Sequence, residues 1–408
     1  NTPEELAKYS NKVNKYLDRI FDEFGLIICG WSAEYDIALR DALYRRKSRR
    51  FSTYWTVKDR VYDEAMQLSN HLKAEQIPIE NANKFFTQLL EKVEALRDIE
   101  KPHPLALPLA IATTKKYLSE DKYRIKLYDL VSEEVQKVYC CFNSERFVNV
   151  ENNSTKEAFR KRLQEYKESL AILIGILDTI IYFDKGKHSD LITMSMERLI
   201  PQKSTSREAY SFNRFPLLIL AYSIGIISIL RNNYKSLAAL FLCSHFKDND
   251  EKKHIIEIIN SQRVFADKWI KWLPTYPDKG IPHTPISEYL HSYMREIVNT
   301  YLPDDEKYEE FFDIFEYLTG LIYLDIINKG TSIESTGSTI GRFAWKRGTP
   351  FNRERLPQSI ERFIENGLNQ GDKWPLLKVG FFNDSIERFK ECCTVYENIL
   401  ERISENWL

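Results

Sequence analysis

The chain has 408 residues and a formal net charge of −1 at pH 7, with 43% hydrophobic and 29% charged residues. This balance excludes long-range electrostatic steering toward nucleic acid or acidic membranes, and it is typical of a globular protein. Aromatic residues reach 13%, whereas glycine and proline number only 14 and 15, which favours long helices over a turn-rich β architecture. We therefore expect a mostly α protein with no direct nucleic-acid contact and no membrane span.

The six cysteines form two adjacent pairs and two single residues, without a C-x-x-C spacing. Neighbouring cysteines point in different directions, so they do not form an ordinary zinc half-site. We expect reduced thiols, a cytoplasmic location and no bound metal.

The first part of the chain alternates helices with apolar strands. Thr2, Pro3 and Glu5 predict a helix start, because the hydroxyl caps free amides, proline fits the first turn and glutamate completes a capping box. Residues 26–29 contain no polar side chain, which predicts a parallel strand that is covered on both faces. Pro78 predicts an edge position for the last strand. The strands are predicted over residues 26–29, 51–57 and 77–79, with helices over 33–44, 60–72 and 83–96.

The pattern changes after residue 98, where Pro102, Pro104 and Pro108 cluster. This predicts a domain boundary, with a first domain over residues 1–98 and an all-α second domain over 99–408. Whether residues 99–408 form one domain or two stays open. Helices are predicted there over residues 121–139, 155–183, 207–230, 234–242, 251–269, 285–301, 307–328, 356–365 and 385–404.

A turn of small residues follows the first buried strand, a place where open α/β folds bind nucleotides. Gly30 lets the backbone approach a ligand closely, and Trp31 follows it. Ser32 offers a hydroxyl and an amide at the start of the next predicted helix, where phosphate oxygens are favoured. Asp36 either hydrogen-bonds back to this turn or binds a ribose hydroxyl.

The run NTPEELAKYSNKVNKYLDRIFDEFGLIICGWSAEYDIALRDAL, the strand at TYW and the segment IPIENANKFFTQLLEKV resemble part of a known domain. They are similar to the closing portion of the sirtuin-like (silent information regulator 2 family) NAD-binding domain of bacterial antiphage defence proteins. The resemblance covers about the first quarter of the chain and implies the end of a Rossmann-like parallel α/β domain.

The resemblance also implies site residues. Gly30, Trp31 and Ser32 correspond to the turn that approaches the ribose and phosphates of NAD, and Asn81 and Asn83 to an element beside the adenine. Trp31 replaces the small polar residue that is common in deacylase-type sirtuins. Asn83 stands where family members often have aspartate, and we expect it to cap a helix.

The family's glycine-rich phosphate loop, its Asn–Asp pair and its catalytic histidine all precede the matched region. We therefore expect the sheet to begin upstream of Asn1, and we assign no catalytic residue to this chain. Near the other end, residues 338–346 and 373–382 resemble segments of the helical extensions of such proteins. Gly341 and Gly380 beside aromatic residues indicate tight packing of a loop against a helix, and the alternative is that Arg342, Lys346 and Arg347 serve a partner or an anionic ligand.

These expectations lead to one main function and two alternatives. The main one is part of an NAD+ hydrolase that acts in antiviral defence by NAD+ depletion, with this chain giving the adenosine side of the site. Its helical domain senses a trigger, such as a phage-derived protein, or builds a homo-oligomer. The first alternative is a non-catalytic helical assembly or sensor module that binds a partner such as a HerA-like ATPase. The second is an NAD-dependent protein deacylase, for which no zinc-binding cysteine quartet is visible.

Overall fold

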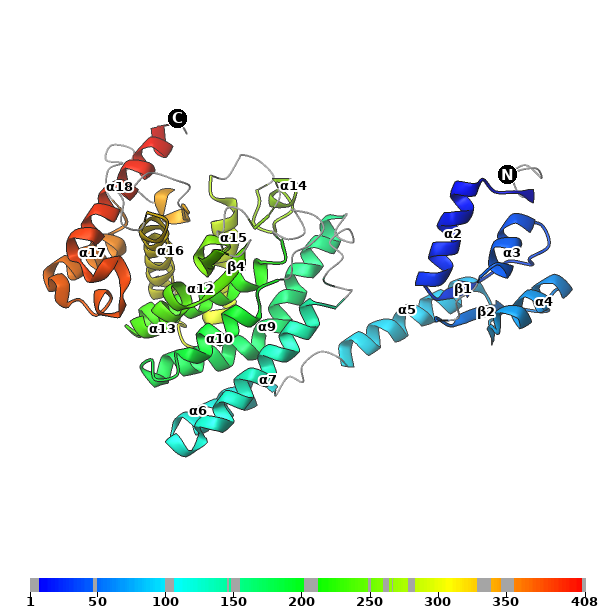
Figure 1. Cartoon of the computed structure of the whole chain (residues 1–408), viewed down its shortest axis with the longest axis horizontal. Helices are drawn as coiled ribbons and strands as arrows, with labels where there is room; N and C mark the ends of the chain where they lie inside the picture. The colour runs from blue at the N-terminus through cyan, green and yellow to red at the C-terminus, as the bar shows by residue number, and fades with distance from the viewer. Residues whose placement is uncertain are drawn as a thin grey trace. The chain divides into compact units, whose positions relative to one another are not determined.

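The chain forms two compact units, Asn1–Lys101 and Pro102–Leu408 (Figure 1). The sequence places the boundary at residue 98. The computed structural model describes residues 7–46, 50–99, 106–144, 147, 155–201, 212–248, 251–259, 264–265, 267–277, 283–328, 339–345 and 356–405. Several residues named above lie outside these ranges. They are Thr2, Pro3 and Glu5 of the predicted first cap, Pro102 and Pro104 of the proline cluster, and Ser338, Lys346 and Arg347.

The first unit contains the three predicted strands, and they are parallel. The sheet has the order β1-β2-β3, with Leu26 opposite Thr53 and Trp55 opposite Gln76. Strand β3 is at an edge, as its proline predicts. The elements of this unit are α2 (Asn11–Glu23), β1 (Leu26–Ile28), α3 (Ile37–Tyr44), β2 (Thr53–Val57), α4 (Asp63–Leu72), β3 (Glu75–Pro78) and α5 (Ala82–Ile99).

Helices α2, α3 and α4 cover one face of this sheet. Their apolar side chains pack with Trp55, which is 3% exposed, and with Leu26 and Ile28. The expectation that β1 is covered on both faces is wrong, because Ile27 points to the other face and is 45% exposed. An unbroken apolar strand therefore leaves one side chain outside the core of this unit.

Two helices of the first unit begin directly after a residue whose side-chain oxygen caps the helix. Helix α3 starts at Ile37, four residues later than predicted, because Asp36 caps it and Ala33 has a left-handed φ of +61°. Helix α5 starts at Ala82, because Asn81 caps it: the Oδ1 atom of Asn81 accepts a hydrogen bond from the amide of Lys84 at 2.8 Å.

The second unit is mostly helical, as predicted, around the apolar helix α12 (Phe215–Leu230), which contacts α9, α15 and α16 (Figure 1). No helix among the described residues is long and apolar enough to cross a membrane. The other longer helices are α6 (Ala106–Leu118), α7 (Arg124–Phe142), α9 (Lys156–Asp184), α10 (Asp190–Arg198), α15 (Pro285–Val298), α16 (Asp305–Ile327), α17 (Gln358–Gln370) and α18 (Ile386–Glu405).

Short elements connect these helices. They are the helices α13 (Tyr234–Ala238) and α14 (Asp267–Ile270), the π-helix η3 (Ala239–Cys243), and the 3-10 helices η1 (Asp121–Tyr123), η4 (Ile255–Glu257), η6 (Arg342–Trp345), η7 (Gly371–Lys373), η8 (Leu377–Val379) and η9 (Phe381–Asp384).

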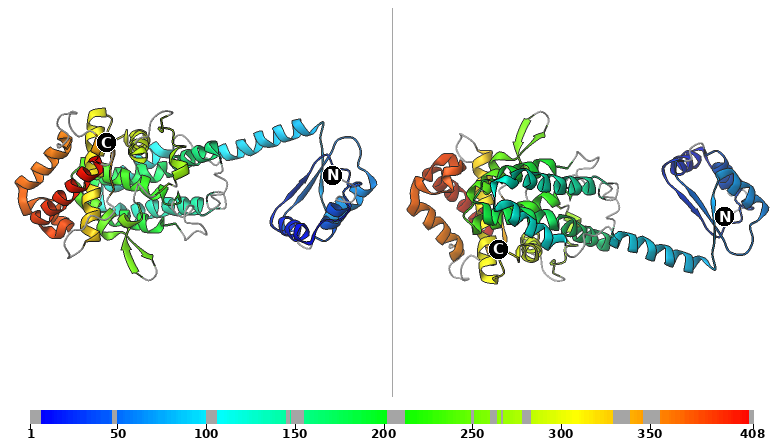
Figure 2. Two further views of the ribbon diagram at one scale, coloured as in Figure 1. Left: turned by 90° about the horizontal axis from the view of Figure 1, so that it is seen from above. Right: turned by 90° about the horizontal axis from the view of Figure 1, so that it is seen from below.

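A β-hairpin corrects the all-α expectation for the second unit. Strands β4 (His245–Asp248) and β5 (Glu251–His254) pair antiparallel and project from the helices in both views of Figure 2. The helix predicted over residues 251–269 is therefore wrong at its start. Its first residues pair with the preceding strand, and the rings of His245 and His254 lie 4.5 Å apart across that pair. Cross-strand contacts of this kind do not change the periodicity of hydrophobic residues along the chain, so the periodicity did not predict the hairpin.

Candidate functional site

The predicted ligand residues gather at one edge of the parallel sheet in the first unit. Because the strands are parallel, the segments that follow β1, β2 and β3 all leave the sheet at its carboxyl edge. The turn at Gly30 follows β1 and Asn81 follows β3, with β2 between them. The exposed residues Lys58, Asp59 and Arg60 follow the central strand β2 and therefore lie at the same edge, between the other two segments. The sequence did not predict them as site residues.

Gly30 has the backbone geometry expected of a turn glycine. Its φ is +71°, in the left-handed region that favours glycine, and a Cβ built there meets no atom within 4 Å. The outer side of this turn is therefore open. Ala33 also has a positive φ, yet it is fully buried, so the core holds the turn in this shape.

Trp31 contributes to the core beneath the turn. Its indole stacks on that of Trp55, with ring centroids 5.9 Å apart and planes inclined by 13°. Both residues pack in the same apolar cluster of the first unit. This contact gives Trp31 a structural role that a small polar residue would not fill.

Ser32 does not lie at a helix N-terminus, which corrects one part of the sequence interpretation. The following helix begins at Ile37, because Asp36 supplies its cap. Among the described residues, the Ser32 hydroxyl accepts a single long hydrogen bond, of 3.4 Å, from the amide of Glu34. Its oxygen is thus held loosely by the fold.

Asp36 uses both carboxylate oxygens within the protein. Oδ1 accepts from the amide of Leu39 at 2.9 Å, and Oδ2 accepts from the Tyr9 hydroxyl at 2.7 Å. Burial and this hydrogen bond to the carboxylate raise the pKa of Tyr9 to about 12. Neither contact is with the turn at residues 30–32, so among the described residues Asp36 caps α3 and does not hydrogen-bond back to the turn as one of the two expectations had it.

We predict that Asp36→Ala lowers the free energy of unfolding of the first unit by about 1–2 kcal/mol, because it removes a helix cap. The loss should appear as faster hydrogen exchange of amides in α3 and α2. Asp41→Ala, on the exposed side of the same helix, is the control. Equal exchange in the two variants would contradict the capping role.

Asn81 and Asn83 have different positions from those expected. Asn81 is the residue that caps α5, whereas Asn83 lies inside its first turn with an exposed side chain. The predicted capping role of Asn83 is therefore wrong, because the helix starts one residue before it. Nearby, Lys84 forms an ion pair of 2.6 Å with Glu80.

A cavity of about 600 Å³ lies beside this edge, on the face of the sheet that α2, α3 and α4 leave uncovered. Ile27, Tyr54 and Ile77 form its sheet side, and Phe85 and Leu89 of α5 form the other side. It is mostly apolar and large enough for a small ligand.

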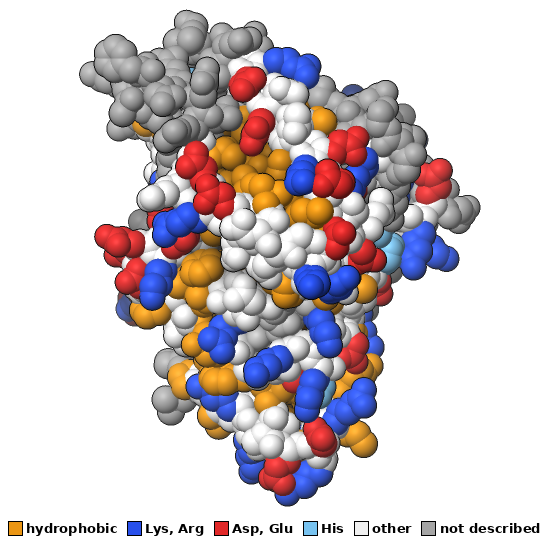
Figure 3. Space-filling view, turned by 90° about the vertical axis from the view of Figure 1, so that its left-hand side faces the viewer, with side chains coloured by type: hydrophobic (Ala, Val, Ile, Leu, Met, Phe, Trp, Pro, Cys, Tyr) orange, Lys and Arg blue, Asp and Glu red, His pale blue; other side chains and the backbone are white. Residues whose placement is uncertain are grey.

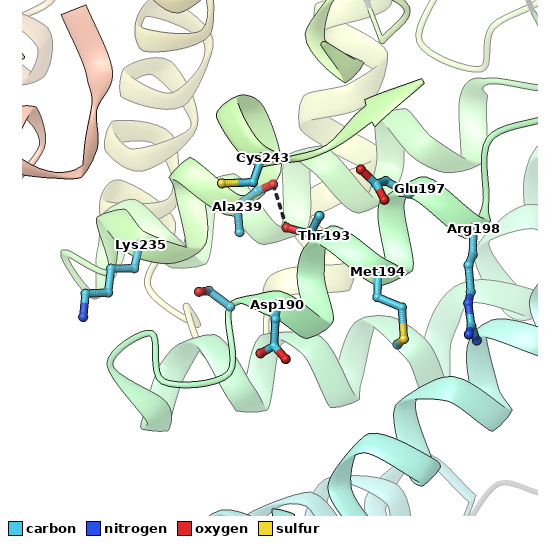
Figure 4. Close-up of a pocket in the computed structure, with 9 residues that line it drawn as sticks. Asp190, Thr193, Met194, Glu197, Arg198, Lys235, Ala239 and Cys243 are labelled. Atoms are coloured by element: carbon cyan, nitrogen blue, oxygen red, sulfur yellow. Dashed lines mark hydrogen bonds between the residues drawn. The ribbon is translucent and has the colours of Figure 1, made fainter. Parts of the chain in front are cut away.

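The second unit has a cavity of about 640 Å³ between α10, α13 and the π-helix (Figure 4). The fold already uses several of its polar groups. Thr193 donates to the carbonyl of Ala239 at 3.3 Å, Glu197 accepts from the amide of His245 at 3.0 Å, and Arg198 donates to Ser132 at 2.7 Å. This cavity therefore offers few free groups for chemistry.

Among the residues that the structure describes, no three His, Cys, Asp or Glu side chains come together as a metal site. Comparison of the chain with protein-family models, with curated proteins and with solved structures gave no match.

Proposed function

We propose that this chain is part of a sirtuin-like NAD+ hydrolase of prokaryotic antiviral defence and that it supplies the adenosine side of the NAD+ site. The observation that carries the proposal is the common edge of the sheet, where an open glycine turn after β1 and a capped helix start after β3 leave parallel strands. In this proposal the sheet belongs to a larger Rossmann-like domain.

The reaction would break the bond between nicotinamide and ribose. Water adds to the anomeric carbon while nicotinamide leaves, which gives ADP-ribose, nicotinamide and a proton. The family's catalytic residues precede the region that resembles this chain, so the proposal assigns only binding to Gly30, Ser32 and Asn81. The loosely held Ser32 hydroxyl is free to donate to a ribose or phosphate oxygen.

The resemblance and the sheet edge favour NAD+ binding as the role of the first unit. In this proposal the helical unit regulates the enzyme. It would sense a trigger, such as a phage-derived protein, or assemble the enzyme into a homo-oligomer.

We predict that Ser32→Ala weakens NAD+ binding about tenfold, because one hydrogen bond to a charged ligand is lost. Titration calorimetry with the product of the whole reading frame measures this change. The melting temperature should stay nearly constant, since within the described part of the chain this hydroxyl has a single hydrogen bond, which is 3.4 Å long. Unchanged affinity would count against the proposed turn.

A separate assay distinguishes the alternatives. The same protein is incubated with NAD+ with and without an acetylated peptide. Consumption without peptide supports the hydrolase, and consumption only with peptide assigns a deacylase. If NAD+ neither binds nor disappears, the non-catalytic module that binds a HerA-like ATPase becomes the better explanation.

A further inference from the structure

A second cavity of the helical unit, of about 490 Å³, is lined by five cationic side chains. They come from three segments: the residue that follows α9, the stretch from the end of α12 into the start of α13, and the η7–η8 region. Among the residues that the structure describes, no aspartate or glutamate lines the cavity. The five cations are Lys185, Arg231, Lys235, Lys373 and Lys378.

These cations lack a carboxylate partner among the described residues. The acids next to them in sequence are engaged elsewhere. Asp184 accepts from the amide of His188 at 2.6 Å and contacts its ring nitrogen Nδ1 at 2.9 Å. Asp372 accepts from the amide of Ile386 at 2.8 Å. The cations therefore repel one another until an anion binds.

Buried anchors hold the three segments in place. Asn233 is 5% exposed and donates to the carbonyl of Ile181 at 2.9 Å, which ties the start of α13 to α9. A Cβ at Gly186 would lie 2.6 Å from the Cβ of Lys235, so these two segments are in close contact. Trp374, which is 2% exposed, fixes the segment that carries Lys373. The cationic side chains thus project from a rigid frame.

The cavity also has an aromatic side. Arg231 lies over the ring of Tyr182, with its guanidinium carbon 4.3 Å from the centroid, and Nε donates to the Tyr182 carbonyl at 3.2 Å. Pro375 and Val379 add apolar surface. Cations beside an aromatic and apolar wall suit a ligand that has both phosphates and a planar ring.

We propose that this cavity binds a phosphorylated small molecule of nucleotide size. Its volume lies within the range of small-ligand sites. Lys and Arg side chains gather over the lower half of the face shown in Figure 3. The net charge of −1 argues against an extended nucleic-acid surface, and a concave site suits a compact anion.

Binding of ATP and of inorganic tripolyphosphate to the full chain tests the proposal by titration calorimetry. Lys373→Gln/Lys378→Gln should weaken binding of both probes at least about tenfold, because two contacts to charged oxygens are lost. The control is Lys252→Gln/Lys271→Gln, which removes the same charge from exposed positions of the same unit. Its affinities should equal those of the unchanged chain.

Lys185→Gln, on a different segment of the cavity, gives a second test and should also weaken both probes. Equal affinities in the cavity and control variants would overturn the proposal, as would the absence of binding by either probe. Tight binding of a short DNA duplex that is lost in the cavity variant would overturn it as well, since the surface would then recognise nucleic acid.

Discussion

Gly225→Ala should lower the free energy of unfolding of the helical unit by about 2–3 kcal/mol, through overpacking of its core. A Cβ at this position of α12 would lie 1.9 Å from Cε2 of Phe315 on α16. The Phe315 ring is 2% exposed and packs against Tyr222 at 4.9 Å, so it has little room to move. The better helix propensity of alanine, about 1 kcal/mol, only partly offsets the clash.

A double-mutant cycle checks this prediction. Phe315→Ala alone should cost about 3–5 kcal/mol, because it leaves a cavity. In that background Gly225→Ala should be neutral or stabilising, since the clashing ring is gone. Urea unfolding followed by far-UV circular dichroism measures all four proteins. An equal loss from Gly225→Ala in both backgrounds would show that the contact with Phe315 is not its cause.

The sequence predicts the elements whose signal is local. The apolar run at Leu26–Ile28 gives the first strand of the sheet, and the apolar run at Phe215–Leu230 gives the central helix. The parallel direction of the strands follows from the helices between them. These features depend on neighbours along the chain, and so periodicity is enough to find them.

What the sequence misses depends on contacts between distant residues. The hairpin needs His245 beside His254, and the Asp36 carboxylate that caps α3 also accepts a hydrogen bond from Tyr9, 27 residues earlier in the chain. The cationic cavity is formed by segments near residues 185, 231–235 and 373–378, which are far apart in the sequence. Within each segment, the one or two cations have the pattern of an ordinary exposed surface, so the sequence does not indicate a site. The sequence also does not predict that the loop after β2 lies at the candidate site, because that position depends on β2 being the central strand of the sheet.

Two buried carboxyl groups of the helical unit should make it less stable as the pH rises toward neutrality. Burial raises the pKa of Asp178 to about 7, although the hydroxyl of Ser223 donates to its oxygens at 2.9 and 2.7 Å and opposes this shift. Burial likewise raises the pKa of Glu316 to about 7, against hydrogen bonds from Ser287 and Tyr222.

The direction follows from proton binding in the two states. Between about pH 4 and pH 7 the folded protein keeps these protons while the unfolded chain releases them. Unfolding therefore becomes easier as the pH rises through this window, and the effect levels off above pH 7. For Asp178, a shift from 3.8 to about 7 corresponds to roughly 4 kcal/mol.

Asp178→Asn should remove about half of this dependence, because the amide carries no charge to bury while Glu316 keeps its own raised pKa. At about pH 8 the variant should be more stable than the unchanged chain by up to about 4 kcal/mol, and below about pH 4 the two should be similar. Urea unfolding across this range tests it, with Asp129→Asn on the exposed surface of α7 as the charge-matched control. If the Asp178→Asn profile ran parallel to that of the control, Asp178 would be ionised in the folded protein, and its burial beside Ser223 would have to be balanced by another group.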